Sequence, residues 1–145
     1  MIRNACLATI LVVLASVTFA SAKDRRSARL DANGNLDALI ARHASANDVP
    51  EDLVRRVIRR ESGGNPRVVH KGNYGLMQIK LGTARALGYR GDAAGLLDAD
   101  TNMTYAVKYL ADAYRLDGGN AGRAVYYYAA GYYYAAKRKA RRRGH

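Results

Sequence analysis

Between Pro50 and Glu61 the hydrophobic and polar positions follow the period of an amphipathic helix. At about 100° per residue, the apolar side chains share one arc of about 140°. They are Leu53, Val54, Val57 and Ile58. Four arginines occupy the opposite side. Pro50 suits a first helical turn, and Glu51 follows Asp48 in the arrangement of a capping box. The pattern predicts a helix over 49–61, ended by two glycines.

This helix places one carboxyl on its apolar side. Glu61 falls at about 80° from Leu53, in the middle of the apolar arc. Burial and the negative end of the helix dipole both raise the pKa of a carboxyl there. A carboxyl that stays protonated near neutral pH can serve as a general acid. The alternative is that Glu61 lies in solvent past the last turn or pairs with an arginine. The other glutamate, Glu51, is explained by capping.

Helical periodicity also dominates the rest of the chain after its first 35 residues. Further helical segments are predicted at 36–46, at 74–87 with an interruption near Gly82, from Met103 through Val107 and Leu110 to Tyr114, and at 124–136. Loops are predicted at 63–73 and 91–98, where turn-forming residues gather. No stretch alternates convincingly as a strand. The predicted fold is therefore all-α, a compact helical domain.

The chain opens with the pattern of an export signal. Arg3 precedes an uncharged apolar run over 5–19, and Ala20-Ser21-Ala22 follows in the small-x-small pattern of a cleavage site. We therefore expect a cleavable secretory signal peptide over 1–22, and a protein secreted to the periplasm or cell envelope. A membrane anchor is the alternative, but the run is short for a span. Cys6 lies within the signal, so the exported chain would fold without disulfides.

Charge adds an expectation about partners. The formal net charge of the whole chain is +12 at pH 7, which favours cell-wall polymers, anionic lipid surfaces or extracellular nucleic acid. Residues 23–35 are polar and are expected to be a flexible lead-in. The basic tail at 137–145 contains "KRKARRR", which is typical of a solvated end that adds nonspecific attraction to polyanions. We expect no specific nucleic acid partner and no stable membrane span after cleavage.

Five short motifs occur in a recognisable order. They are "ESGGNP", "YGLMQI", "GTA", "YAVKYL" and "YYAAG". Each is weak alone, but the ordered set resembles the catalytic domain of the soluble lytic transglycosylases, relatives of goose-type lysozyme. The resemblance covers 36–136. It implies a lysozyme-like helical fold that acts on the glycan strands of peptidoglycan, with neither a metal nor an organic cofactor. The three histidines, His43, His70 and His145, also suggest no metal cluster.

The resemblance implies a reaction at the β-1,4 bond between N-acetylmuramic acid and N-acetylglucosamine. A single glutamate, matched here by Glu61, protonates the leaving oxygen and then acts as base on the muramoyl 6-hydroxyl. The product carries a 1,6-anhydro end, and no water enters. Such a mechanism agrees with the unusual position of Glu61, because the carboxyl must start protonated. It also removes the need for the paired carboxylate of ordinary glycosidases.

Other site residues are implied by the same resemblance. The "GLMQ" motif maps onto residues 75–78, where the family places Met77 and Gln78 against the sugars. Tyr74, directly before the motif, joins them as an expected substrate-binding residue. Gln78 can both donate and accept hydrogen bonds.

Two tyrosine triplets, at 126–128 and 132–134, flank Gly131. Most of the six are expected to bury their rings in the core while their hydroxyl groups reach solvent. Tyr128 is the exception, because it matches the family's Ala-Tyr-Asn-Ala-Gly motif and is expected to bind substrate. The chain departs from that motif at Ala129, which removes a polar contact. His70 stands where many relatives have serine, and we expect it to be a surface loop residue.

Two alternatives remain open at the level of sequence. A hydrolytic muramidase of the same fold would need a positioned water and a second carboxylate, for which Asp92, Asp98 and Asp100 are candidates. A noncatalytic cationic wall-binding protein is the other alternative. Ala129 favours it, whereas the presence of Glu61 on the apolar face opposes it.

Overall fold

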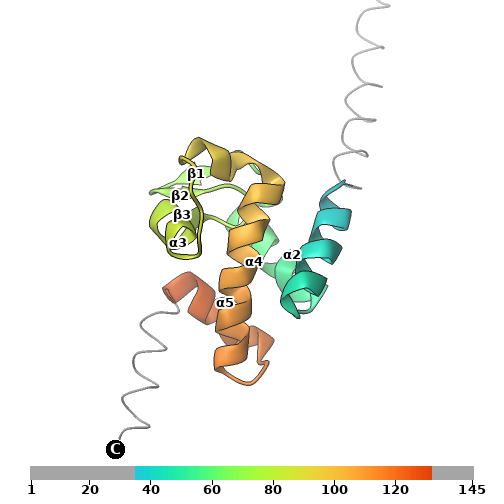
Figure 1. The fold of residues 1–145 in the computed structure, drawn as a ribbon. Helices are drawn as coiled ribbons and strands as arrows, with labels where there is room; N and C mark the ends of the chain where they lie inside the picture. Colours follow the sequence, from blue (N-terminus) through green and yellow to red (C-terminus); the bar gives the residue numbers. More distant parts are fainter. Residues whose placement is uncertain (1–34, 132–145) are drawn as a thin grey trace, which may run out of the picture. The chain divides into compact units, whose positions relative to one another are not determined.

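The computed structural model describes residues 35–131, which are mainly helical (Figure 1). This confirms the predicted helical class. A helix covers 35–47, and the compact unit begins within it at Asp37. The elements that follow are α2 (Glu51–Glu61), β1 (Val69–His70), β2 (Asn73–Tyr74), β3 (Ile79–Lys80), α3 (Leu81–Ala86), the 3-10 helix η1 (Ala94–Leu97), α4 (Ala99–Leu116) and α5 (Ala121–Ala130).

The apolar face predicted for α2 is confirmed, because all four of its apolar side chains are buried. The predicted capping box is wrong. Pro50 occupies the N-cap position, so Asp48 stands too far ahead to cap α2. Instead Asp48 takes a left-handed conformation with φ 54° and ends the preceding helix, its N–H donating to the Ser45 carbonyl. Glu51 forms an ion pair with Arg55 at 3.2 Å.

Three short strands correct the expectation that the chain has none. They form an antiparallel sheet in the order β1-β2-β3. Each strand has two residues, too few for an alternating pattern to be visible in the sequence. A helix from Tyr74 was also predicted wrongly, since α3 begins only at Leu81. Gly75 and Gln78 have φ values of 74° and 50°, which no helix accommodates.

The long helix α4 runs through the middle of the unit and packs against α5 and η1 (Figure 1). Its buried face contains Asn102, Met103, Ala106, Val107, Leu110, Ala111 and Ala113. This confirms the predicted period except at Tyr114, which is half-buried. The Asp98 carboxylate caps the helix by accepting from the Thr101 N–H at 2.8 Å. After α4, two glycines in left-handed conformation turn the chain toward α5. The core that supports the site is therefore built around α4.

The last helix ends earlier than the sequence predicts. α5 ends at Ala130, and Gly131 takes a φ of 79°. Within the first tyrosine triplet, Tyr128 is 8% exposed, whereas Tyr126 is 61% exposed and so is not a core residue. The second triplet, the expected signal peptide, nearly all of the lead-in and the basic tail lie outside the described residues. No helix among residues 35–131 is long and apolar enough to cross a membrane.

Candidate active site

The carboxyl of Glu61 stands where the buried face of α2 ends. Glu61 is the last residue of the helix, and its side chain is 22% exposed. Burial raises the pKa of Glu61, and the positive charge of Arg60 opposes this shift. Arg60 Nε lies 3.8 Å from Glu61 Oε1. The carboxyl is thus partly desolvated, yet still reachable from outside.

Glu61 opens onto a cleft of about 540 Å³. The lining residues come from α2, β2, β3, α3, α4 and α5, and are Arg60, Glu61, Asn73, Gln78, Ile79, Lys80, Thr83, Tyr109, Tyr128, Ala129, Ala130 and Gly131. Among the described residues, Glu61 is the one carboxylate that lines this cleft. This set of polar and aromatic side chains can hold a sugar, because rings stack on aromatic faces while hydroxyls need hydrogen-bond partners.

The end of α2 is tied to the turn that follows β2. Ser62 Oγ donates to the Leu76 carbonyl at 2.7 Å, next to the catalytic candidate. Gln78, in the same turn, lines the cleft. Its Nε2 donates to the carbonyls of Val68 and Gly75, both at 2.9 Å. Both amide hydrogens of Gln78 are therefore used inside the protein, which leaves its carbonyl oxygen as the group for a ligand.

A buried asparagine holds this turn against α4. Asn102 is fully buried, and its side chain accepts from the Met77 N–H at 3.0 Å. Its Nδ2 donates to the carbonyls of Tyr74 and Leu96 at 2.7 and 2.8 Å. The turn passes so close to Asn102 that a Cβ on Gly75 would lie 2.4 Å from Nδ2. Sequence reasoning missed Asn102, whose only signal is an amide at an apolar position of the α4 period.

Two tyrosines form the aromatic part of the cleft. Tyr128 packs edge-to-face on Tyr109, with ring centroids 5.3 Å apart. Burial raises the pKa of Tyr128 well above that of an ordinary phenol, and the negative charge of Glu61 acts in the same direction. Tyr109 was not singled out from the sequence, although it lies within the "YAVKYL" motif.

The structure does not bring all the predicted substrate-binding residues to the cleft. Gln78 and Tyr128 line it, but Tyr74 and Met77 do not. Met77 is 0% exposed, so its side chain belongs to the core. Tyr74 is half-buried in β2 and offers its backbone carbonyl to Asn102. Ala129, at the position where the family has asparagine, does line the cleft.

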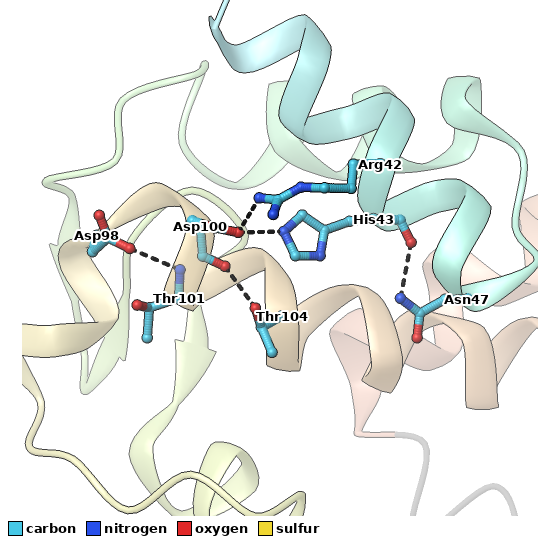
Figure 2. Close-up of polar contacts among 7 residues, drawn as sticks. All are labelled: Arg42, His43, Asn47, Asp98, Asp100, Thr101 and Thr104. Carbon is cyan, nitrogen blue, oxygen red and sulfur yellow. Dashed lines mark hydrogen bonds and ion pairs between the residues drawn. The ribbon is translucent and has the colours of Figure 1, made fainter.

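The three aspartates considered as a second carboxylate are occupied elsewhere. Asp98 caps α4, and Asp92 accepts from the Gly95 N–H at 2.9 Å. Figure 2 shows Asp100 between Arg42 and His43, which come from the helix at 35–47. Its Oδ1 lies 2.5 Å from Arg42 Nη2 and 2.6 Å from His43 Nε2. The hydrogen bond from Arg42 lowers the pKa of Asp100, and the bond from His43 adds to it.

Histidines do not contribute to the cleft within the described part of the chain. His43 is 8% exposed and belongs to the pair with Asp100. His70 is exposed in β1, as expected of a surface residue. In residues 35–131 no group of three side chains is arranged to hold a metal ion.

Comparison with known proteins agrees with this geometry. The chain is 34% identical over 90 residues to the soluble lytic murein transglycosylase of Escherichia coli strain K12, a match that covers 57% of this chain and 14% of the relative. The protein of the same name from Escherichia coli O157:H7 matches equally. The chain thus spans only a small part of the length of these relatives. The family described as the transglycosylase SLT domain matches residues 38–145. The chain therefore belongs to the transglycosylase SLT domain family.

Proposed function

We propose that this protein is a peptidoglycan lytic transglycosylase. Its substrate would be the β-1,4 bond between N-acetylmuramic acid and N-acetylglucosamine, and its product a 1,6-anhydromuramoyl end. The observation that carries the proposal is Glu61, a partly desolvated carboxyl with a raised pKa in a cleft lined by polar and aromatic side chains. Membership of the SLT family supports the same reaction. Peptidoglycan lies outside the cytoplasmic membrane, which fits the expected export signal.

In the proposed mechanism Glu61 acts twice. The protonated carboxyl first gives its proton to the glycosidic oxygen, and the bond from that oxygen to C1 of the muramoyl residue breaks. The carboxylate then takes the proton of the 6-hydroxyl of the same muramoyl residue, whose oxygen bonds to C1. Glu61 regains its proton, and no water is consumed. A raised pKa favours the first step because it enlarges the fraction of the acid that is protonated at a given pH.

The composition of the cleft supports a transglycosylase over a hydrolase. An inverting hydrolase needs a second carboxylate to activate water, and a retaining one needs it as nucleophile. Among the described residues that line the cleft, only Glu61 carries a carboxyl group. Asp92, Asp98 and Asp100 form the contacts described above, away from the lining. An internal hydroxyl as acceptor requires no second carboxylate.

Gln78 and Tyr128 are proposed to bind the sugar beside Glu61. Because both amide hydrogens of Gln78 are donated to backbone carbonyls, its oxygen would accept from a sugar hydroxyl or acetamide N–H. The Tyr128 hydroxyl is likewise engaged with a carbonyl, so its ring would provide an apolar wall. Ala129 offers no polar group where the family has asparagine, so fewer polar contacts hold the substrate.

Digestion of purified peptidoglycan tests the proposal. Fragments released by the parent and by Glu61→Gln are compared by mass spectrometry, with Glu51→Gln as the matched control. We expect the parent and the control to release muramoyl products one water lighter than those of a hydrolase. Reducing muramic ends as the main product would identify a hydrolytic muramidase instead. Binding to sacculi without any released fragment would identify a noncatalytic wall-binding protein.

A further inference from the structure

We propose that Lys80 and Arg60 form a carboxylate-binding rim of the cleft, which selects glycan strands whose muramoyl residues carry free carboxylates over neutral strands. The inference rests on the proposed function and names the chemistry of the substrate more closely. N-Acetylmuramic acid differs from N-acetylglucosamine by a lactyl group that ends in a carboxyl. That carboxyl is either free or extended by a stem peptide that carries its own carboxylates.

The charges that line the cleft favour an anionic ligand. Its described charged residues are Arg60, Glu61 and Lys80. When Glu61 is protonated, as the acid step requires, the lining holds two positive charges and no negative one. A neutral glycan cannot use these charges, whereas an anionic substituent beside the scissile bond is attracted by both.

Lys80 is available for such a contact. Its residue is exposed, and no ion pair within residues 35–131 involves it. In β3 it stands directly opposite Asn73 of β2, so the two side chains share one face of the sheet. Asn73 and Lys80 both line the cleft. The Asn73 Nδ2 already donates one hydrogen to the His70 carbonyl at 3.0 Å. The sheet therefore presents an ammonium beside an amide with one donor hydrogen left, a combination suited to an anionic group among hydroxyls.

Arg60, in the last turn of α2, supplies the second positive charge. Its side chain is more than half exposed, and its pairing with Glu61 at 3.8 Å is longer than a hydrogen bond. Protonation of Glu61 removes that attraction. No other ion pair among the described residues involves the guanidinium, which can then turn its donors toward a substrate carboxylate.

The test compares three soluble glycan substrates. The first carries stem peptides, the second has been freed of peptide by an amidase and exposes lactyl carboxylates, and the third is the second with its carboxyls converted to neutral amides. Initial rates of anhydro-end formation give KM and kcat for each. The parent is expected to show a higher KM for the amidated strand than for its carboxylate counterpart.

Lys80→Gln is the decisive variant. It removes one positive charge from the cleft, and Lys80, unlike Arg60, forms no ion pair with Glu61. Its KM should rise about two- to fivefold on carboxylate strands, as expected for a solvent-accessible ion pair, with kcat nearly unchanged. On the amidated strand the variant and the parent should agree. Lys108→Gln, an exposed lysine of α4 outside the cleft, is the matched control and should change neither KM.

Arg60→Gln is measured beside Arg59→Gln, whose residue is exposed and does not line the cleft. Because Arg60 lowers the pKa of Glu61, its variant is compared at the pH optimum found for each protein. If Lys80→Gln and Arg60→Gln raise KM on peptide-free strands, the rim binds the lactyl carboxylate. An increase only on peptide-bearing strands assigns it to the stem.

Equal KM values of the parent for all three substrates would overturn the inference, as would a Lys80→Gln effect that persists on the amidated strand. In both cases anhydro ends would still form, so the proposed function would stand. If no substrate yields anhydro ends, the proposed function itself fails.

Discussion

The phenol of Tyr128 donates a 2.7 Å hydrogen bond to the backbone carbonyl of Met77. This bond joins α5 to the turn between β2 and β3, across 51 positions of sequence. Gln78 follows Met77 directly and lines the cleft beside Tyr128. The tyrosine thus fixes the position of the turn that presents Gln78, in addition to forming a wall of the cleft.

Tyr128→Phe removes this bond and leaves the Met77 carbonyl without a partner in a buried place. An unsatisfied buried group costs about 1–3 kcal/mol, so the thermal midpoint should fall. Activity should fall as well, because Gln78 is less well positioned. Tyr126→Phe is the matched control, since Tyr126 is exposed and should tolerate the change. Loss of activity at an unchanged thermal midpoint would mean that the hydroxyl acts on the substrate directly.

Glu61→Gln keeps the shape of the side chain but cannot transfer a proton. The rate of anhydro-end formation should fall by about 10²-fold or more, the usual effect of losing a general acid. Product release measured by mass spectrometry checks this. A variant that cleaves at the parental rate would contradict the assigned role of Glu61.

The same variant should be more stable than the parent at neutral pH. The pKa of Glu61 is raised on folding, so the stability it contributes is present at low pH and is lost as pH rises through its folded pKa. Glutamine does not titrate and avoids this loss. The gain in thermal midpoint should therefore be visible at pH 7 and should vanish well below about pH 4.3, the ordinary pKa of glutamate. A gain that is independent of pH would have another origin.

Asp100→Ala leaves the buried imidazole of His43 without its partner. Loss of the partner of a buried polar group costs about 1–3 kcal/mol, which a thermal or urea unfolding curve resolves. Asp112→Ala is the control, because Asp112 pairs with an exposed arginine and no buried group depends on it. The pKa of Asp100 is lowered on folding, so its stabilisation is present above the ordinary aspartate pKa. The difference from the parent should shrink as the pH falls. Equal effects of the two variants would contradict a specific role for His43.

Gly75→Ala should destabilise the protein far more than Gly72→Ala. Both glycines have φ near 75°, so both variants share the cost of a left-handed alanine. Only at position 75 does the added Cβ meet other atoms, at 2.3 Å from the Leu96 carbonyl oxygen, whereas position 72 has open space. Thermal midpoints of the two variants measure the difference. Similar values would show that the turn can move away from α4.

The sequence predicted what depends on local periodicity. The buried face of α2, the helical segment that contains Met103, Val107 and Leu110, and the placement of Glu61 all follow from spacing within one helix. The sheet did not follow, because two-residue strands are held by pairing and by left-handed turn residues rather than by any alternation. The predicted cap at Asp48 failed because Pro50 takes the N-cap position.

Within the site, the residues that sequence reasoning missed depend on contacts between distant segments. Asn102 forms hydrogen bonds with backbone groups 25 and 28 positions away in the sequence. A local sequence pattern cannot predict such contacts. Met77 was predicted to contact substrate, but the structure buries its side chain and uses its backbone to hold the turn. Gln78 matched its motif, yet only the structure indicates that its amide hydrogens are already donated.

The three hydrogen bonds of Asn102 also bear on how this protein can change over generations. They anchor the turn from the inside, together with the bond from Tyr128, so its shape does not depend on the exposed rim residues Lys80 and Arg60. Rim residues such as Lys80 can therefore be exchanged while the geometry around Glu61 is preserved. In this architecture the range of accepted substrates can drift under selection, or be altered by an engineer, independently of the proton-transfer chemistry.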